Sequence, residues 1–208
     1  MNIIIFGASG KTGRKLITQC LRKGHNVTAF VRNPANMKLW DDNLRIIKGD
    51  ALNFQNVSDA ISGQDVVISA LGNRTSQVIW KSNKNISDAL NNIILGMNNH
   101  KVKRLLFITS FGVNKKIFPL EKLFIRTILW KLFADIPKQE KLIKNSNLNW
   151  TIVRPARLVN TDKTGQYKVG ENLSIGIFSK ISRADVADFL IKNVQNNNLT
   201  GKTITISY

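Results

Sequence analysis

The chain has few of the residues from which metal centres and disulfides are built: its 208 residues include one cysteine and two histidines. Cys20 alone can form neither an intramolecular disulfide nor a cysteine-based zinc site. His25 and His100 are too few for a multi-histidine metal centre, so we expect no metal site. Cys20 lies in a helix-patterned stretch, where a buried thiol acts as a small hydrophobic side chain.

Long apolar runs are also missing. No stretch approaches the roughly 18 uninterrupted apolar residues that are needed to cross a bilayer. The apolar run at residues 1–6 is too short for the core of a signal peptide, and no basic leader precedes it. These absences predict a cytoplasmic protein.

Acidic residues are scarce: 13 of them stand against 31 lysines and arginines, which gives a formal net charge of +18 at pH 7. A charge of this size is typical of proteins that bind nucleic acid or an anionic membrane. The basic residues are nevertheless spread along the chain, without the block of about five or six like charges that marks a binding arm. We therefore expect neither nucleic acid nor a membrane as the partner, and keep binding to nucleic acid or to an anionic surface as a minor alternative.

The sequence shows no linker rich in proline, glycine or serine and no internal repeat, so we expect residues 1–208 to form one domain. Nearly continuous apolar runs are typical of strands that are covered on both faces. Strands are expected at residues 2–6, 26–31, 44–47, 65–70, 104–109, 150–153 and 203–207. Helices are expected at residues 12–22, 57–61, 86–97, 120–133 and 185–194. This alternation predicts an α/β protein with a doubly wound parallel sheet of about seven strands, in three αβα layers.

Three segments are expected to form loops on the substrate side, at residues 73–85, 111–147 and 158–182. Within the third, residues 160–180 have three glycines and little periodicity, and we expect them to form a mobile loop over the substrate side. Within the second, residues 120–133 have a basic amphipathic pattern. This pattern suits a helix on a membrane surface. We prefer a core-facing helix with snorkelling cations, which could line the substrate pocket or a dimer face.

A glycine-rich segment follows the first expected strand directly. Residues 7–13 read GASGKTG, and an amphipathic helix comes next. Strand, glycine loop and helix in this order indicate the dinucleotide-binding loop of an NAD(P)-binding Rossmann fold. Gly7 permits the tight turn, Gly10 lets the backbone approach a pyrophosphate, and Gly13 lets the helix pack close to the sheet. Free N–H groups at the start of the helix face the phosphates.

The second expected strand ends at Arg32, where an enzyme that prefers NAD usually carries an acidic residue to hold the ribose 2′-hydroxyl. A guanidinium group binds phosphate through a planar fork. Arg32 therefore favours the 2′-phosphate of NADP, and the alternative is a solvated loop residue. Lys11 and Arg14 would add positive charge nearby. We expect the cofactor to be NADP(H).

Further candidate residues follow the later strands, at the carboxyl edge where open α/β sheets bind ligands. Asp50 follows the third strand and can accept a hydrogen bond from the adenine amine. Gly72 follows the fourth strand and lets the backbone pass close to the cofactor. Either residue can instead serve an ordinary turn. Ser110 follows the fifth strand and places a hydroxyl near the nicotinamide.

Several segments together resemble those of a known family. They are residues 7–13, Arg32, residues 49–50, residues 109–110, residues 150–155 with the sequence WTIVRP, and residues 181–187 with the sequence ISRADVA. This set resembles the atypical short-chain dehydrogenase/reductase family, and within it the NAD(P)H-binding proteins similar to biliverdin-IXβ/flavin reductase. The resemblance covers nearly the whole chain. It is specific for fold and cofactor and poor for substrate, because the same branch includes proteins similar to the nitrogen-metabolite-repression regulators, which bind a dinucleotide without turning it over.

The resemblance implies a role for each matched residue. Residues 7–13 form the pyrophosphate loop, Arg32 contacts the 2′-phosphate, and residues 50–51 contact the adenine. The expected cofactor-binding residues are Gly7, Ser9, Gly10, Lys11, Thr12, Gly13, Arg32, Asp50, Ala51, Leu71, Gly72, Ser110 and Pro155. Ser110, beside the nicotinamide, is also the candidate catalytic residue. The expected substrate contacts are Arg74, Phe111 and Arg157, the last of which stands where the reductases of this branch carry a histidine.

Tyrosine is scarce as well, and neither Tyr167 nor Tyr208 begins a Tyr-x-x-x-Lys pair. Reduction of a carbonyl group places a proton on oxygen and needs such a positioned acid. Flavins, quinones and tetrapyrroles take hydride into a conjugated system with less demand for one. The sequence therefore predicts an NADPH-dependent oxidoreductase that acts on a planar conjugated acceptor, as a monomer or homodimer. The alternative is a non-catalytic NADP-binding regulator or scaffold.

Overall fold

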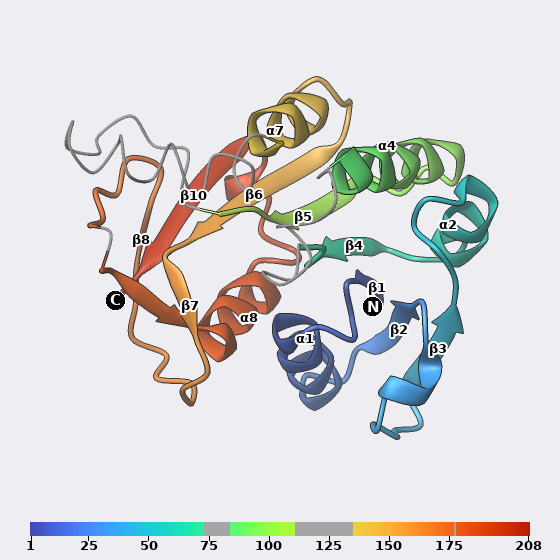
Figure 1. Cartoon of the computed structure of the whole chain (residues 1–208), viewed down its shortest axis with the longest axis horizontal. Coiled ribbons are helices and arrows are strands. Elements are labelled where there is room, and N and C mark those ends of the chain that lie inside the picture. Colours follow the sequence, from blue (N-terminus) through green and yellow to red (C-terminus); the bar gives the residue numbers. More distant parts are fainter. Residues whose placement is uncertain (73–83, 111–134, 177) are drawn as a thin grey trace.

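The computed structural model describes residues 1–72, 84–110, 135–176 and 178–208 (Figure 1). The strands of the main sheet are β1 (Asn2–Phe6), β2 (Asn26–Val31), β3 (Leu44–Lys48), β4 (Val66–Ser69), β5 (Arg104–Ile108), β6 (Asn149–Pro155), β8 (Lys168–Gly170) and β10 (Lys202–Ser207). Two further strands, β7 (Arg157–Val159) and β9 (Lys180–Ser182), pair with each other. The helices are α1 (Lys11–Arg22), α2 (Phe54–Ile61), α4 (Lys84–Asn99), α7 (Ile136–Lys144) and α8 (Arg183–Lys192). Short 3-10 turns occur at Pro34–Asn36 and Asn197–Leu199.

The main sheet has the strand order β3-β2-β1-β4-β5-β6-β10-β8. β1 pairs in parallel with both β2 and β4, so the direction in which strands are added reverses beside β1. β8 runs antiparallel to β10 at one edge. The predicted doubly wound sheet is confirmed. Open α/β sheets bind ligands beside such a reversal, at the carboxyl ends of the strands.

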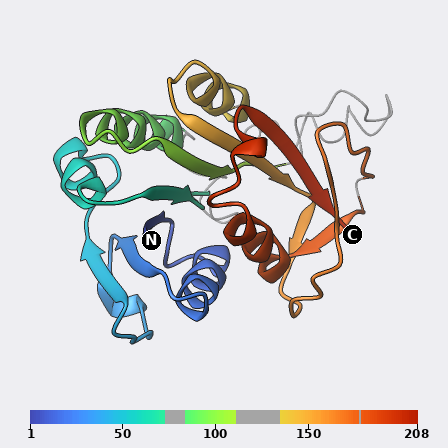
Figure 2. The ribbon, with the colours of Figure 1, turned by 180° about the vertical axis from the view of Figure 1, so that it is seen from behind.

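Helices cover both faces of the sheet (Figures 1 and 2). Ile3 and Ile5 of β1 are fully buried in the core that the sheet forms with α1 and α8. Ile4 and Phe6 of the same strand enter the core on the other face, together with side chains of α2, α4 and α7. Alternate side chains of one strand thus reach two cores, which explains the unbroken apolar run in the sequence. The three predicted layers are present.

Helix α1 packs on the sheet through one apolar face. Its buried residues Gly13, Leu16, Ile17 and Cys20 recur at the spacing of an amphipathic helix. Burial raises the pKa of the Cys20 thiol to about 12. The thiol therefore stays protonated and acts as the small hydrophobic group that the sequence predicts.

The structure corrects two of the three predicted loops and shortens the other. Residues 136–144, expected within a loop at 111–147, form α7, which buries Ile136, Gln139, Glu140 and Ile143. α4 begins at Lys84, so the loop expected at 73–85 is shorter at that end. The helix expected at residues 120–133 lies outside the described residues.

The loop expected at residues 158–182 is also corrected by the structure. It contains the last two residues of β7, all of β8 and all of β9. β7 pairs with β9, and β8 pairs with β10, so each strand is held by a partner distant in sequence. Three-residue strands carry no readable periodicity, which is why the sequence pattern did not predict them.

Asp185 holds much of this segment in place. It is fully buried in the first turn of α8, and its carboxylate accepts hydrogen bonds from the Tyr208 hydroxyl (2.6 Å) and the Gly165 N–H (2.8 Å). It also accepts from the Thr164 N–H (3.0 Å) and the Ser182 hydroxyl (2.9 Å). Burial by itself raises the pKa of Asp185, but these hydrogen bonds together hold it below its ordinary value. One carboxylate thus joins the 160s loop, α8 and the last residue of the chain.

Arg104, at the start of β5, is a buried cation that contacts backbone carbonyls. Its Nη2 donates to the Asn193 carbonyl (2.8 Å) and its Nε to the Val194 carbonyl (3.2 Å), just beyond the end of α8. Its Nη1 donates to Thr151 Oγ1 (2.9 Å) on β6. The negative end of the α8 dipole favours a cation at this position. Desolvation lowers the pKa of the guanidinium.

Replacing Asp185 by asparagine should lower the free energy of unfolding by about 2–4 kcal/mol at neutral pH, because an amide accepts fewer and weaker hydrogen bonds than a carboxylate. The folded-state pKa of Asp185 lies below the ordinary value of 3.8, so its contribution is present above that value and is lost as the pH falls through the folded-state pKa. The difference between wild type and D185N should therefore shrink in acid. Urea unfolding at a series of pH values measures it.

The matched control is Asp162→Asn, an exposed carboxylate in the same segment, which should leave stability unchanged at every pH. A stability difference for D185N that is constant across the acidic range would show that the carboxylate charge contributes nothing.

Candidate functional site

A cleft of about 260 Å³ lies at the carboxyl ends of β1, β2, β3 and β4. It contains eight of the predicted cofactor-binding residues, which come from four separate strand ends. They are Gly7, Ser9, Gly10, Arg32, Asp50, Ala51, Leu71 and Gly72. Ile86 and Ala89 of α4 close one side of it. The structure thus brings these eight residues together. Lys11, Thr12 and Gly13, which were predicted with them, lie in the first turn of α1 and do not line the cleft.

Gly7 makes the turn out of β1 against the end of β4. Its φ of +76° lies in the region that side chains other than glycine rarely adopt. A Cβ atom at this position would stand 2.5 Å from the carbonyl oxygen of Ala70. Gly7 is therefore required both by the turn and by the close approach of two backbones, as the glycine pattern predicts.

The start of α1 also lies very close to the backbone of the loop that precedes it. A Cβ on Gly13 would collide with the Gly7 carbonyl oxygen and Ala8, so the helix lies tightly on the loop that precedes it. Gly10 is the N-cap, no side chain caps the helix, and no acidic residue lies in the first turn. The first N–H groups of the helix lack intrahelical partners and present a partial positive charge. These groups fit a pyrophosphate.

Arg32 lines the cleft and is exposed to solvent. The loop that follows it is held at two points. Asn33 accepts a hydrogen bond from the Ala35 N–H (3.1 Å). The Arg14 guanidinium donates to the carbonyls of Ser9 (3.2 Å) and Asn36.

Arg14 thus connects the glycine loop to the loop after β2. The sequence predicts Arg14 only as additional positive charge near the cofactor. The structure shows a second role, the hydrogen bonds to two backbone carbonyls, which no sequence pattern indicated.

Asp50 serves a turn and also faces the cleft. Its Oδ1 accepts a hydrogen bond from the Leu52 N–H (3.1 Å), which is the turn chemistry that the sequence left as an alternative. Its other oxygen accepts no hydrogen bond from a described residue and can meet a ligand amine. Asn56 accepts from the Asp50 N–H (3.2 Å), and Asn92 of α4 donates to the Ala51 carbonyl (3.0 Å). These asparagines hold the backbone of the loop after β3, and the sequence did not single them out.

The remaining predicted residues lie outside this cleft or outside the described residues. Arg74 and Phe111 lie outside the described residues. Ser110 follows β5, where the neighbouring Thr109 N–H donates to the Val153 carbonyl (2.9 Å), so the ends of β5 and β6 are in register. Pro155 is buried at the end of β6. These two residues lie at the carboxyl ends of β5 and β6 and do not line the 260 Å³ cleft.

The two arginines beside Pro155 face different surroundings. Arg154 forms a paired contact with the buried Glu140 of α7, with Nε to Oε1 at 2.8 Å and Nη2 to Oε2 at 2.5 Å. Arg154 is therefore used to attach α7 to the sheet. Arg157 is exposed, and its N–H donates to the Ser179 carbonyl (3.1 Å). Of the two, only Arg157 has a guanidinium group that forms no hydrogen bond or ion pair with a described residue.

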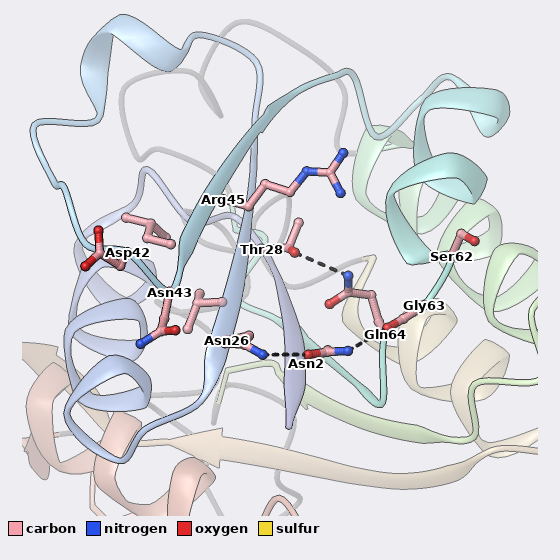
Figure 3. Close-up of a pocket in the computed structure, with 11 residues that line it drawn as sticks. Asn2, Asn26, Thr28, Asp42, Asn43, Arg45, Ser62, Gly63 and Gln64 are labelled. Carbon is pink, nitrogen blue, oxygen red and sulfur yellow. Dashed lines mark hydrogen bonds between the residues drawn. The ribbon is translucent and has the colours of Figure 1, made fainter.

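A second hollow, of about 410 Å³, lies at the opposite edge of the sheet (Figure 3). Its lining is polar and includes a short hydrogen-bonded set. Asn26 donates to Asn2 Oδ1 (3.0 Å), and Gln64 donates to Thr28 Oγ1 (3.2 Å). It lies at the amino ends of the strands and contains none of the predicted site residues. Because parallel sheets bind dinucleotides at the carboxyl ends of strands, the smaller cleft is the candidate cofactor site.

A glycine turn at the reversal point of a doubly wound sheet, with an uncapped helix start beside it, defines a Rossmann-type dinucleotide-binding protein. A comparison with protein families agrees with this class. The model of the NAD(P)H-binding family matches residues 7–197. The chain belongs to this family, which confirms both the resemblance and the NAD(P)H cofactor class.

Two curated relatives are similar over nearly the whole chain. The chain is 26% identical to protein TIC 62 of Arabidopsis thaliana, over 95% of its own length and 34% of that protein. It is 24% identical to the photosystem II assembly factor Ycf39 of Synechocystis, over 99% of its own length and 62% of that protein. The chain therefore spans about a third of TIC 62 and less than two thirds of Ycf39.

Two solved structures share the fold. One is a short-chain dehydrogenase/reductase of Veillonella parvula in complex with NADP, with a TM-score of 0.79 and 19% identity, covering 100% of this chain and 94% of that one. The other is ChuY of Escherichia coli O157:H7, described as an anaerobilin reductase, with a TM-score of 0.81 and 20% identity, covering 99% and 96% of the two chains. Identities this low show a common fold alone.

Within the described residues, no helix is long and apolar enough to span a membrane. Among these same residues, no group of three histidine, cysteine, aspartate or glutamate side chains is placed to hold a metal ion.

Replacing Gly7 by alanine should lower the free energy of unfolding by about 2–4 kcal/mol, because a Cβ is strained at this φ and overlaps the Ala70 carbonyl. Gly72→Ala is the matched control in the same cleft, since a Cβ there meets no atom of the described residues within 4 Å. It should change stability by less than about 0.5 kcal/mol. Urea denaturation measures both, and equal stability of the two variants would contradict the close approach of β1 and β4.

Proposed function

We propose that this protein uses NADPH to reduce a planar conjugated acceptor, such as a flavin, a quinone or a linear tetrapyrrole. The preference for NADPH is supported above all by the position of Arg32, which lies in the cleft that also contains Gly7 and Gly10. The strand end around Arg32, residues 30–33, has no acidic residue. A guanidinium at this point binds a 2′-phosphate and gives no comparable contact to a 2′-hydroxyl.

In this proposal, different residues bind different parts of the cofactor. The N–H groups at the start of α1 bind the pyrophosphate, and Gly7 and Gly13 let the backbone come close enough for this. Asp50 accepts a hydrogen bond from the adenine amine. NADPH supplies the hydride when bound. Ser110 orients the nicotinamide end, and Arg157 contacts the acceptor.

The surroundings of the tyrosines support a conjugated acceptor. The Tyr167 hydroxyl donates to Asp188 (2.9 Å), and the Tyr208 hydroxyl donates to Asp185 (2.6 Å). Burial and the Asp188 carboxylate raise the pKa of Tyr167. Both hydroxyls are therefore used within the fold, and neither is available as the proton donor that carbonyl reduction needs. A flavin, quinone or tetrapyrrole accepts hydride into its ring system, and water can supply the proton.

A non-catalytic regulator or scaffold that binds NADP is the second candidate. The name of one relative supports it, because Ycf39 is described as an assembly factor and matches this chain over 99% of the chain's length. A dinucleotide-binding fold does not by itself imply turnover. The two candidate functions share the cofactor site and differ only in whether bound NADPH transfers its hydride to an acceptor.

Replacing Arg32 by glutamine should weaken NADPH binding by about tenfold to a hundredfold, because charge-assisted hydrogen bonds to the 2′-phosphate are lost. NADH binding should change little. Fluorescence titration of both dinucleotides measures the two affinities. Arg45→Gln, an exposed arginine at the opposite edge of the sheet, is the control and should alter neither. Wild-type protein that prefers NADH, or an R32Q variant that loses both affinities equally, would contradict the role of Arg32.

The wild-type protein should oxidise NADPH in the presence of at least one acceptor from a panel of FMN, a benzoquinone and biliverdin. The loss of nicotinamide absorbance measures the rate, with acceptor alone as the blank. R32Q should lower kcat/KM for NADPH in proportion to its lost affinity. Tight NADPH binding with no oxidation above the blank for the whole panel would reject the reductase and support the regulator.

A further inference from the structure

A hollow of about 330 Å³ lies between α1 and α8 and shares no lining residue with the cofactor cleft. The two helices lie side by side in both ribbon views (Figures 1 and 2), and Gln19 of α1 donates a hydrogen bond to the Ala184 carbonyl of α8 (2.8 Å). The hollow extends along α1 to Lys23, just past the end of the helix. Because a helix rises about 1.5 Å per residue, Arg22 lies roughly 16 Å along the axis from Lys11 beside the glycine loop. We call this space the α1–α8 hollow.

The lining of the α1–α8 hollow is strongly basic. Its cations are Lys15, Arg22, Lys23, Lys163 and Lys192. Its acids are Asp162 and Asp188, so the lining carries a formal charge of +3. The cofactor cleft, in contrast, has one cation, Arg32, and one acid, Asp50, in its lining.

Asp188 positions the two lysines in one wall of the hollow. This carboxylate is 5% exposed and pairs with Lys192 (2.7 Å) and Lys163 (3.3 Å). Burial by itself raises the pKa of Asp188, but the hydrogen bonds from Lys192, Tyr167 and Lys163 together hold it below its ordinary value. Asp188 therefore stays ionised and fixes two ammonium groups at the rim of the hollow.

The opposite wall is formed by cations from α1 and the residue that follows it. Lys15, Arg22 and Lys23 are exposed, and none of them forms an ion pair with a described residue. Like charges held close together repel one another, and the repulsion extends over about 10 Å at moderate ionic strength. An anion that enters the hollow relieves this repulsion and meets cations from both walls.

We propose that the α1–α8 hollow is a second anion-binding site, distinct from the cofactor cleft, for a small ligand that carries two or more negative charges of the phosphate type. A ligand with a single negative charge could bind to one lysine anywhere on this surface. Cations on two facing walls select a ligand that spans the space between them, such as a diphosphate. The site accounts for part of the +18 charge that the cofactor leaves unexplained.

Isothermal titration of inorganic pyrophosphate into protein saturated with NADPH tests the proposal. With the cofactor cleft filled, pyrophosphate should still bind at one site, and its affinity should fall as the salt concentration rises. In an R22Q/K23Q double variant this affinity should fall by about tenfold, while NADPH affinity stays unchanged.

The matched control is K103Q/K141Q, which removes the same charge at exposed positions outside the hollow and should bind pyrophosphate as the wild type does. Equal weakening in the control would show diffuse attraction to a basic surface and would overturn the proposal. Pyrophosphate that binds only by displacing NADPH would overturn it as well, while leaving the proposed function intact.

Discussion

The close approach of β1 to β4 at Gly7 is the constraint on which the cofactor site depends. With a φ of +76° and the Ala70 carbonyl against it, the backbone turns at once from the sheet into the loop that starts α1. Gly13 then lets the helix lie directly on that loop. A side chain at either position would push the helix start away from the strand ends. The N–H groups at the helix start would no longer face the cleft that we propose for the pyrophosphate.

The loops around this turn are held before any ligand binds. Arg14 donates to carbonyls of the glycine loop and of the loop after β2, and Asn92 of α4 donates to the Ala51 carbonyl. A site whose loops are already in place loses less conformational entropy on binding. Hydrogen bonds of buried charged side chains hold other irregular segments of the fold in the same way. Asp185 and Arg104 hold segments that lack regular structure of their own, by hydrogen bonds to backbone groups.

Most of the sheet could be predicted from the sequence, and so could the glycine turn and helix start of the candidate site. Apolar runs predict strands covered on both faces, and the spacing of Gly7, Gly10 and Gly13 predicts the turn and the helix that follows it. The segment 158–182 could not be predicted, because its short strands exist only through β7–β9 and β8–β10 pairing. α7 was missed for a related reason. Its nine residues give little more than two turns of periodicity.

The sequence by itself determined the fold class, the family and the residues of the cofactor loop, because these depend on local pattern: strand, glycine turn and amphipathic helix in direct succession. Only the tertiary structure decided which polar residues serve the fold and which remain free for a ligand. Arg14, Arg154 and Arg157 look equally available in the sequence, yet Arg14 contacts carbonyls, Arg154 pairs with Glu140, and Arg157 is exposed. The physical reason is that a side chain's partners come from segments distant along the chain, and only folding brings them within hydrogen-bond distance.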